Sequence, residues 1–171
     1  MSGFTASGAA IKDVRNESGA GLDDAKQLAP LGFELTRQSP VDGRGLETWI
    51  YIKANGALAA GAVVGRGSGV ATYSDVIPAT TTTGISGVIG VVVNPIGDNG
   101  FGFIMKKGYC AVTAGAGTID INEAIIVDST TPGTAMCVTG GAPSSAEDGF
   151  GFATANANAA DTALCYINCR G

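Results

Sequence analysis

Histidine is absent from the 171 residues of this sequence. Histidine is the usual general base of enzymes, the partner of serine and cysteine nucleophiles and a common zinc ligand. The adjacent acid pairs, Asp23-Asp24 and Glu147-Asp148, lie in polar segments, where solvated carboxylates are the ordinary case. We therefore expect a protein that is not an enzyme and that has no catalytic residues.

Basic residues and long apolar runs are also scarce. The net charge is −5 with only 10 Lys and Arg, and Lys106-Lys107 is the only adjacent basic pair, which argues against nucleic-acid binding. No apolar run is long enough to span a bilayer, and the first residues lack the pattern of a signal peptide. The expectation is a protein made in a cytoplasm, with neither nucleic acid nor membrane as a partner.

The four cysteines all lie in the C-terminal part of the chain, at positions 110, 137, 165 and 169. Such a group indicates a disulfide framework in a short secreted chain, but without a signal peptide buried thiols are favoured. The spacing Cys165-x3-Cys169 differs from the Cys-x2-Cys of zinc sites, so no metal or other cofactor is expected. A period of two places Cys165, Ile167 and Cys169 on one side of a strand.

Charge divides the chain near Glu47. Residues 1–48 hold 12 of the 25 charged residues and are predicted to form an N-terminal arm. Its one plausible helix is Leu22–Ala29, which Pro30 ends, and Ser39–Gly45 has the Pro and Gly content of a mobile linker. An alternative left open is that Leu31–Leu35 is itself a first strand that packs on the body.

The rest of the chain contains an internal repeat. Leu58 has a counterpart in Ile119, at an offset of 61 (119 − 58), and Gly90 has one in Gly151 at the same offset. Two further matches, Gly69-Val70-Ala71 with Gly133-Thr134-Ala135 and Lys107-Gly108 with Arg170-Gly171, keep the order at offsets of 64 and 63. The sequence thus predicts one domain over 49–171, made of two similar halves, 49–108 and 109–171.

Each half reads as short strands between turns, with no room for a helix. Asn55-Gly56, Asp98-Asn99-Gly100 and Thr131-Pro132-Gly133 supply turn residues. In the first strand, Trp49, Tyr51 and Lys53 alternate with Ile50 and Ile52, so one face is expected in the core and the other outside or on a partner. The fold class is all-β.

The segments Ala57–Val64 and Gly87–Val93, followed by a strand that ends in Lys107-Gly108, resemble the capsid decoration (cement) proteins of tailed bacteriophages. The resemblance covers roughly residues 49–171 and lies in strand order and composition. It implies a compact β-barrel or β-tulip-like body on the outside of the phage head, after an extended N-terminal arm that lies across the major capsid protein. It also implies a virion protein that stabilises the shell by bridging capsid subunits, as a homo-oligomer for which a trimer is preferred and a dimer stays open.

On that resemblance, the apolar residues of the arm are candidate capsid-binding residues, because they can lose water at an interface. They are Phe4, Ile11, Leu22, Leu28, Leu31, Phe33 and Leu35. An alternative function is a phage receptor- or glycan-binding β-domain of the fibre or lectin type. Its weakness is the small supply of Trp and Tyr for sugar platforms.

Overall fold

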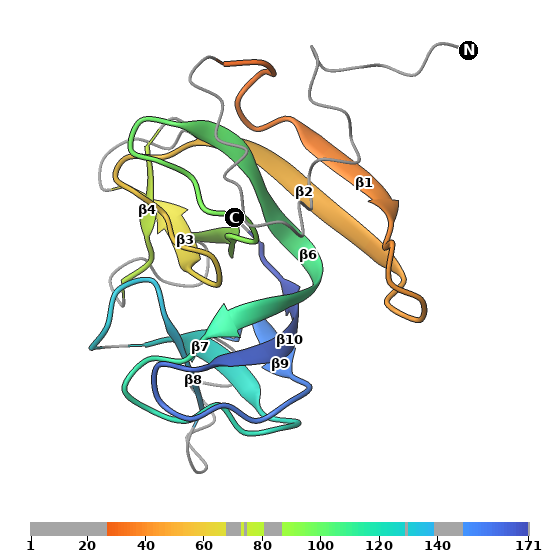
Figure 1. Ribbon diagram of the computed structural model, residues 1–171, viewed down its shortest axis with the longest axis vertical. Helices are drawn as coiled ribbons and strands as arrows, with labels where there is room; N and C mark the ends of the chain where they lie inside the picture. Colours follow the sequence, from red (N-terminus) through yellow and green to blue (C-terminus); the bar gives the residue numbers. More distant parts are fainter. Residues whose placement is uncertain are drawn as a thin grey trace.

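The structure is a computed structural model that describes residues 27–67, 73, 75–80, 87–128, 130–138 and 149–170. These residues form ten strands in one antiparallel sheet (Figure 1), so the all-β prediction is confirmed. The strands are β1 (Glu34–Gln38), β2 (Leu46–Lys53), β3 (Val63–Arg66), β4 (Val76–Pro78), β5 (Val88–Val91), β6 (Phe101–Thr113), β7 (Ala124–Val127), β8 (Ala135–Cys137), β9 (Gly151–Ala153) and β10 (Thr162–Asn168). Among the described residues, no helix is long and apolar enough to cross a membrane.

The sheet is open and branched. Its path runs β4-β3-β5-β6-β10-β9-β7-β8, while β2 pairs with β6 and β1 with β2. The 13-residue β6 therefore joins both halves. The β-barrel predicted for the body is wrong, because the sheet does not close: β4 pairs only with β3 and β8 only with β7, each with one further isolated bridge, Val76↔Ala54 and Ala135↔Ala114.

The segment before β2 is joined to the sheet by β1. The β1–β2 register runs from Glu34 opposite Ile50 to Gln38 opposite Leu46. The mobile linker predicted at Ser39–Gly45 is wrong, since these residues connect the two strands and the Ser39 amide donates to the Gly45 carbonyl at 2.8 Å. The first-strand alternative is closer to the structure, but β1 shares only Glu34 and Leu35 with the predicted Leu31–Leu35. Of the predicted helix, 22–26 lie outside the described residues, and Gln27–Ala29 are not helical.

The same pairing scheme occurs twice along the chain. The bridge Leu58↔Ile96 has its equivalent in Ile119↔Ala157, with each partner displaced by 61. The Val64↔Gly90 pair has its equivalent in Ile125↔Gly151. The predicted border between the halves, 108/109, falls inside β6 at Gly108, whose φ is +131°.

The turns are repeated as well. Asn99 and Ala160 occupy equivalent turns, and both have positive φ, 59° and 65°. The left-handed conformation costs a residue with a Cβ atom roughly 1–2 kcal/mol. Asn tolerates it through local hydrogen bonds, whereas Ala has none to offer.

Replacing the exposed Ala160 with glycine is therefore expected to stabilise the protein. Relief of the left-handed strain outweighs the backbone entropy of glycine, for a net gain of about 0.5–1 kcal/mol. Urea unfolding measures the change. Ala159→Gly is the control, because Ala159 has no positive φ, and it should lower stability. A loss of stability in Ala160→Gly would contradict the assignment of strain.

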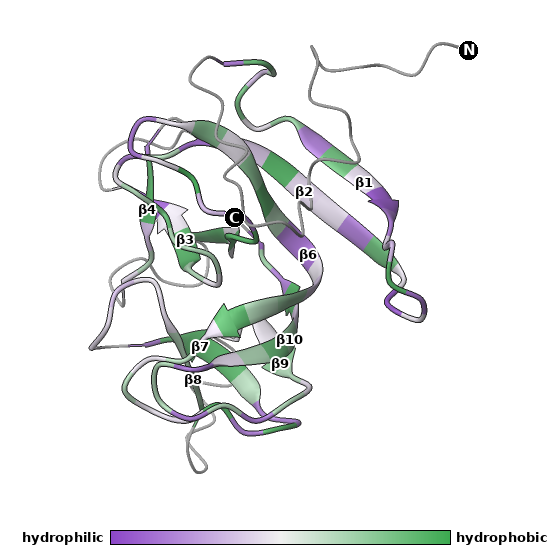
Figure 2. Ribbon diagram, viewed as in Figure 1, coloured by the Kyte–Doolittle hydropathy of each residue, from purple (hydrophilic) through white to green (hydrophobic). Residues whose placement is uncertain are grey.

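The interior contains two hydrophobic clusters, and Figure 2 shows hydrophobic residues along the central strands. The smaller cluster lies within the first half and includes Ile50, Ile52 and Leu58. The larger one combines the interior of the second half with Trp49 and Met105 of the first. Both faces of β2 are therefore buried. The expectation of one outer face on this strand is wrong: the second half covers Trp49, whereas the segment before β1 reaches Tyr51, whose hydroxyl accepts from the Leu28 amide.

The four cysteines are buried free thiols, as predicted. Cys165, Ile167 and Cys169 point inward, while Tyr166 is half-buried and Asn168 exposed on the other face. Burial raises the pKa of the Cys165 thiol to about 12 and that of Cys169 to about 12. These two thiols therefore stay protonated and serve as small hydrophobic groups.

Candidate attachment surface

The candidate capsid-binding residues divide into two groups. Leu28, Leu31, Phe33 and Leu35 are half-buried against the body. The Phe33 ring meets the Phe103 ring edge-on at 6.4 Å, and Leu35 packs on the larger core cluster. The Leu28 amide donates to the Tyr51 hydroxyl at 3.1 Å. Phe4, Ile11 and Leu22 lie outside the described residues.

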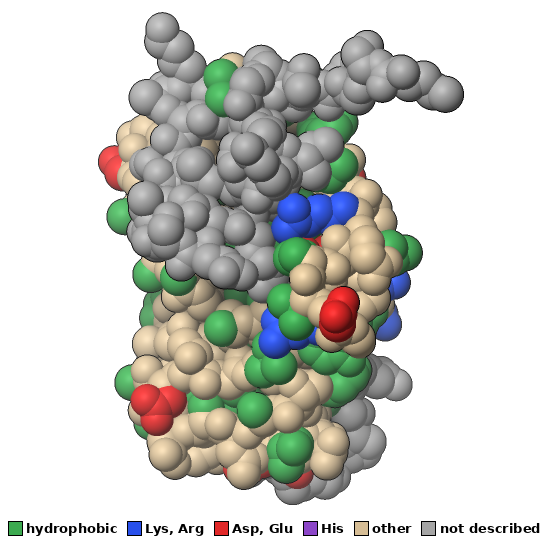
Figure 3. Space-filling model, turned by 45° about the vertical axis from the view of Figure 1, so that its right-hand side comes forward, with side chains coloured by type: hydrophobic (Ala, Val, Ile, Leu, Met, Phe, Trp, Pro, Cys, Tyr) green, Lys and Arg blue, Asp and Glu red, His purple; other side chains and the backbone are tan. Residues whose placement is uncertain are grey.

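A buried carboxylate holds β1 on β2. Glu47 is 0% exposed and accepts hydrogen bonds from the Ser39 hydroxyl at 2.6 Å and the Trp49 indole at 3.2 Å. The Arg37 guanidinium lies 3.5 Å from the same carboxylate and 5.6 Å from the centre of the Trp49 ring. Figure 3 shows Lys and Arg side chains gathered on one side of the molecule. The network makes β1 part of a rigid surface.

The second half presents a row of aromatic side chains on its outer face. Tyr166 on β10 lies opposite Tyr109 on β6 and opposite Phe152 on β9. The ring centres of Tyr109 and Tyr166 are 5.1 Å apart, and those of Phe152 and Tyr166 are 5.3 Å apart. Phe152 is 43% exposed, which is unusual for phenylalanine. We call Tyr109, Tyr166 and Phe152 the outer aromatic row.

The equivalent positions in the first half are covered. There Met105 on β6 lies opposite Trp49 on β2 and Val91 on β5, the same arrangement of three strands. All three side chains are fully buried, in one cluster with the interior of the second half. The first half therefore has its outer face packed on the second, whereas the outer aromatic row lies at the end of this stack. Sequence reasoning considered only Trp and Tyr as platforms and missed Phe152, which the offset of 61 pairs with Val91.

Asp128 is a buried carboxylate with a structural use. Its Oδ1 accepts from the amide and hydroxyl of Thr130 at 2.6 and 2.7 Å and from the Thr131 amide at 3.2 Å, and its Oδ2 accepts from the Ala116 amide at 2.8 Å. Burial raises the pKa of this carboxyl, but these hydrogen bonds outweigh it, so the pKa lies below its ordinary value of 3.8. Asp128 thus ties the loop after β7 to the turn after β6.

Because the folded-state pKa of Asp128 is lowered, its contribution to stability is present above about pH 4 and lost as the pH falls through the folded value. Asp128→Asn is expected to cost about 1–2 kcal/mol at neutral pH through weakened charge-assisted hydrogen bonds. Urea unfolding of both proteins from pH 7 to pH 2.5 measures it. The difference between their free energies of unfolding should narrow below pH 4. A difference that does not change with pH would contradict the lowered pKa of Asp128.

Within the described ranges, no group of three or more His, Cys, Asp or Glu could hold a metal ion. The outer aromatic row and the charged β1–β2 edge are the candidate attachment surfaces.

Comparison with solved structures finds proteins that share this fold. One of them is the head fiber gp8.5 N base of bacteriophage phi29, with a TM-score of 0.52 over 71% of this chain and 94% of that one. The two sequences are 15% identical, so the similarity is one of fold. No protein-family model matches the chain. No curated protein is similar to it in sequence.

Proposed function

We propose that this protein is a structural component of the outer surface of a bacteriophage head, bound to the capsid shell. The observation that carries the proposal is the fold shared with 94% of a phage head fiber base. The resemblance to capsid decoration proteins in strand order and composition supports it independently. Together they favour a protein whose role is to bind and to bear load.

The binding partner is the major capsid protein, and the outer aromatic row is a contact surface. Exposed aromatic rings held by neighbouring strands lose little side-chain entropy on binding and supply much apolar area. Residues 1–48 add a second contact through Phe4, Ile11 and Leu22, with Leu28, Leu31, Phe33 and Leu35 where the chain joins the body. A homo-oligomer, a trimer before a dimer, would bind a symmetric shell multivalently and bridge its subunits.

The direct test is binding of the purified protein to phage heads that lack it. Co-sedimentation is expected, with added density on the outer surface in electron microscopy. Decorated heads should also resist heat and osmotic shock better than bare heads. Absence of the protein from sedimented heads would overturn the proposal, and equal resistance of the two kinds of head would remove the cement role.

The contact surface is tested with Phe152→Ser. An aromatic contact at the centre of an interface contributes about 2 kcal/mol or more, so binding should weaken at least roughly 10-fold. Ile121→Ser is the matched control, because Ile121 is also apolar and 49% exposed but lies in the loop before β7, outside both proposed contacts. Equal loss in both variants would move the contact away from the outer aromatic row.

A further inference from the structure

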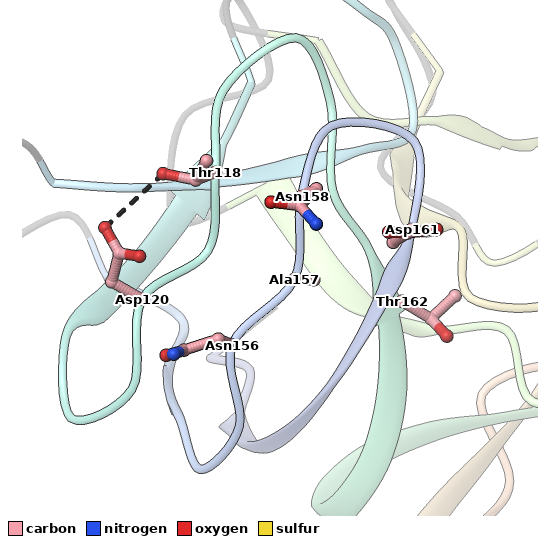
Figure 4. A pocket seen from close by; sticks show the side chains of 7 residues that line it. All are labelled: Thr118, Asp120, Asn156, Ala157, Asn158, Asp161 and Thr162. Carbon is pink, nitrogen blue, oxygen red and sulfur yellow. Dashed lines mark hydrogen bonds between the residues drawn. The ribbon is translucent and has the colours of Figure 1, made fainter.

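Two loops of the second half form a polar hollow. One loop precedes β7, and the other joins β9 to β10 (Figure 4). The hollow encloses about 360 Å3, within the range of small-molecule sites, which is roughly 300–1,000 Å3. Its lining consists of Thr118, Asp120, Asn156, Ala157, Asn158, Asp161 and Thr162.

The backbone of the hollow is rigid. Ile119 and Ala157 exchange two hydrogen bonds, of 2.9 and 2.8 Å, which hold the two loops together. The Asn156 Oδ1 accepts from the Ile121 amide at 2.7 Å, so the amide nitrogen of Asn156 remains as a donor. The Thr118 hydroxyl donates to Asp120 at 3.4 Å. Donors and acceptors are thus arranged before any ligand arrives.

The first half shows that the fold does not require these polar side chains. Its equivalent loops have the same geometry: Leu58 and Ile96 exchange the same two bonds, and the Gly100 amide donates to the Gly97 carbonyl as the Asp161 amide donates to that of Asn158. Yet the residues 61 positions before the lining carry no polar side chain. They are Ala57, Ala59, Pro95, Ile96, Gly97, Gly100 and Phe101.

We propose that the hollow binds a neutral saccharide. Thr hydroxyls and Asn amides both donate and accept, and Asp carboxylates accept, which matches sugar hydroxyls that do both. The lining has no Lys or Arg, and Asp120 and Asp161 repel anions, so phosphate and acidic sugars do not fit. Asp120 and Asp161 are the only acids of the lining, and within the described residues no group of three or more acidic side chains is gathered as a calcium site would need.

This inference goes beyond head attachment, and it revives the glycan-binding alternative at a defined place. It does not depend on an exposed Trp or Tyr, since neither lines the hollow. The outer aromatic row and the hollow use different side chains. The two activities can therefore be separated by substitution.

The test is a glycan array probed with the labelled full-length chain, followed by calorimetric titration with the neutral sugars that bind. The decisive variant carries Thr118→Ala, Asp120→Ala, Asn158→Gly and Asp161→Gly, the side chains of the equivalent first-half positions. It should keep the fold, as checked by circular dichroism, and lose at least 10-fold in affinity. If the fourfold variant does not fold, Asn158→Gly alone takes its place, with an expected loss of about 3-fold in glycan affinity. Thr36→Ala/Asn168→Ala, exposed polar positions elsewhere, should bind as the parent does.

Three results of the glycan experiments would overturn the inference: no neutral glycan bound, binding of acidic glycans alone, or undiminished binding by the folded variants. A fourth would come from titration with calcium chloride, if a calcium ion bound in place of sugar. Head co-sedimentation of the same variants keeps the two proposals apart. If glycans bind and heads do not, the proposed function fails while the saccharide site stands.

Discussion

Glu47→Gln is expected to lower the free energy of unfolding by about 3–5 kcal/mol, the usual cost of removing one partner from a buried ion pair. The variant leaves the Arg37 guanidinium beside a neutral amide in a place where Glu47 is 0% exposed. In the parent protein the Ser39 hydroxyl and the Trp49 indole N–H each donate to a carboxylate oxygen of Glu47. In the variant one of these two donors would face the NH2 group of the glutamine, which is also a donor. Urea unfolding followed by the fluorescence of Trp49, the single tryptophan, measures the loss.

The chain offers a matched control for this variant in the neighbouring pair of Glu34 and Lys106. Their charged atoms are closer, at 2.7 Å, but the Glu34 side chain is 44% exposed. Exposed pairs contribute about 0–1 kcal/mol, so Glu34→Gln should cost less than 1 kcal/mol. If both variants lost the same small amount, the buried network would not be what holds β1 on the sheet.

The fate of residues 39–47 shows where sequence reasoning is ambiguous. Pro40, Gly43 and Gly45 suit a mobile linker and a hairpin connection equally well, because both need chain reversal and positive φ. What decides between them is Glu47, a charge that the structure buries. A single charged residue carries no sign of its burial in the sequence, so the sequence favoured a linker over the hairpin that Glu47 stabilises.

The two faces of β2 illustrate a second limit. Alternation of residue types along one strand predicts that one face of the strand is buried, as it is for Ile50 and Ile52. It does not predict which distant segment covers the opposite face. Trp49 is buried because the second half packs on it, which is a contact between distant segments. The inward cysteines were predictable, since Cys165, Ile167 and Cys169 follow a local period of two within one strand.

The polar hollow was accessible from the sequence in principle. Once the offset of 61 is known, Thr118 and Asp120 align with Ala57 and Ala59, and the contrast of polar with apolar residues is visible without coordinates. The contrast becomes informative only with the Ile119↔Ala157 bridge, because this bridge brings the second loop of the hollow, nearly 40 residues further along the chain, against the first loop. Duplicated folds can thus be searched for positions at which one copy has departed from the other.

Gly151→Ala is expected to cost about 3 kcal/mol, at the upper end of the usual range for overpacking a closely packed interior. A Cβ atom at this position would lie under 3.0 Å from the Tyr166 carbonyl oxygen, a backbone atom that cannot rotate away. The equivalent Gly90 faces the Met105 carbonyl in the same manner, so Gly90→Ala should lose a similar amount. Urea unfolding of the two variants therefore tests the duplication itself.

Gly117→Ala is the control, because its nearest contact, Met136 Cβ at 3.6 Å, is an ordinary one. If Gly151→Ala lost no more stability than Gly117→Ala, β9 and β10 would not approach each other at Gly151 as closely as the structure shows. The outer aromatic row would then lack the rigid support on which its use as a binding surface depends.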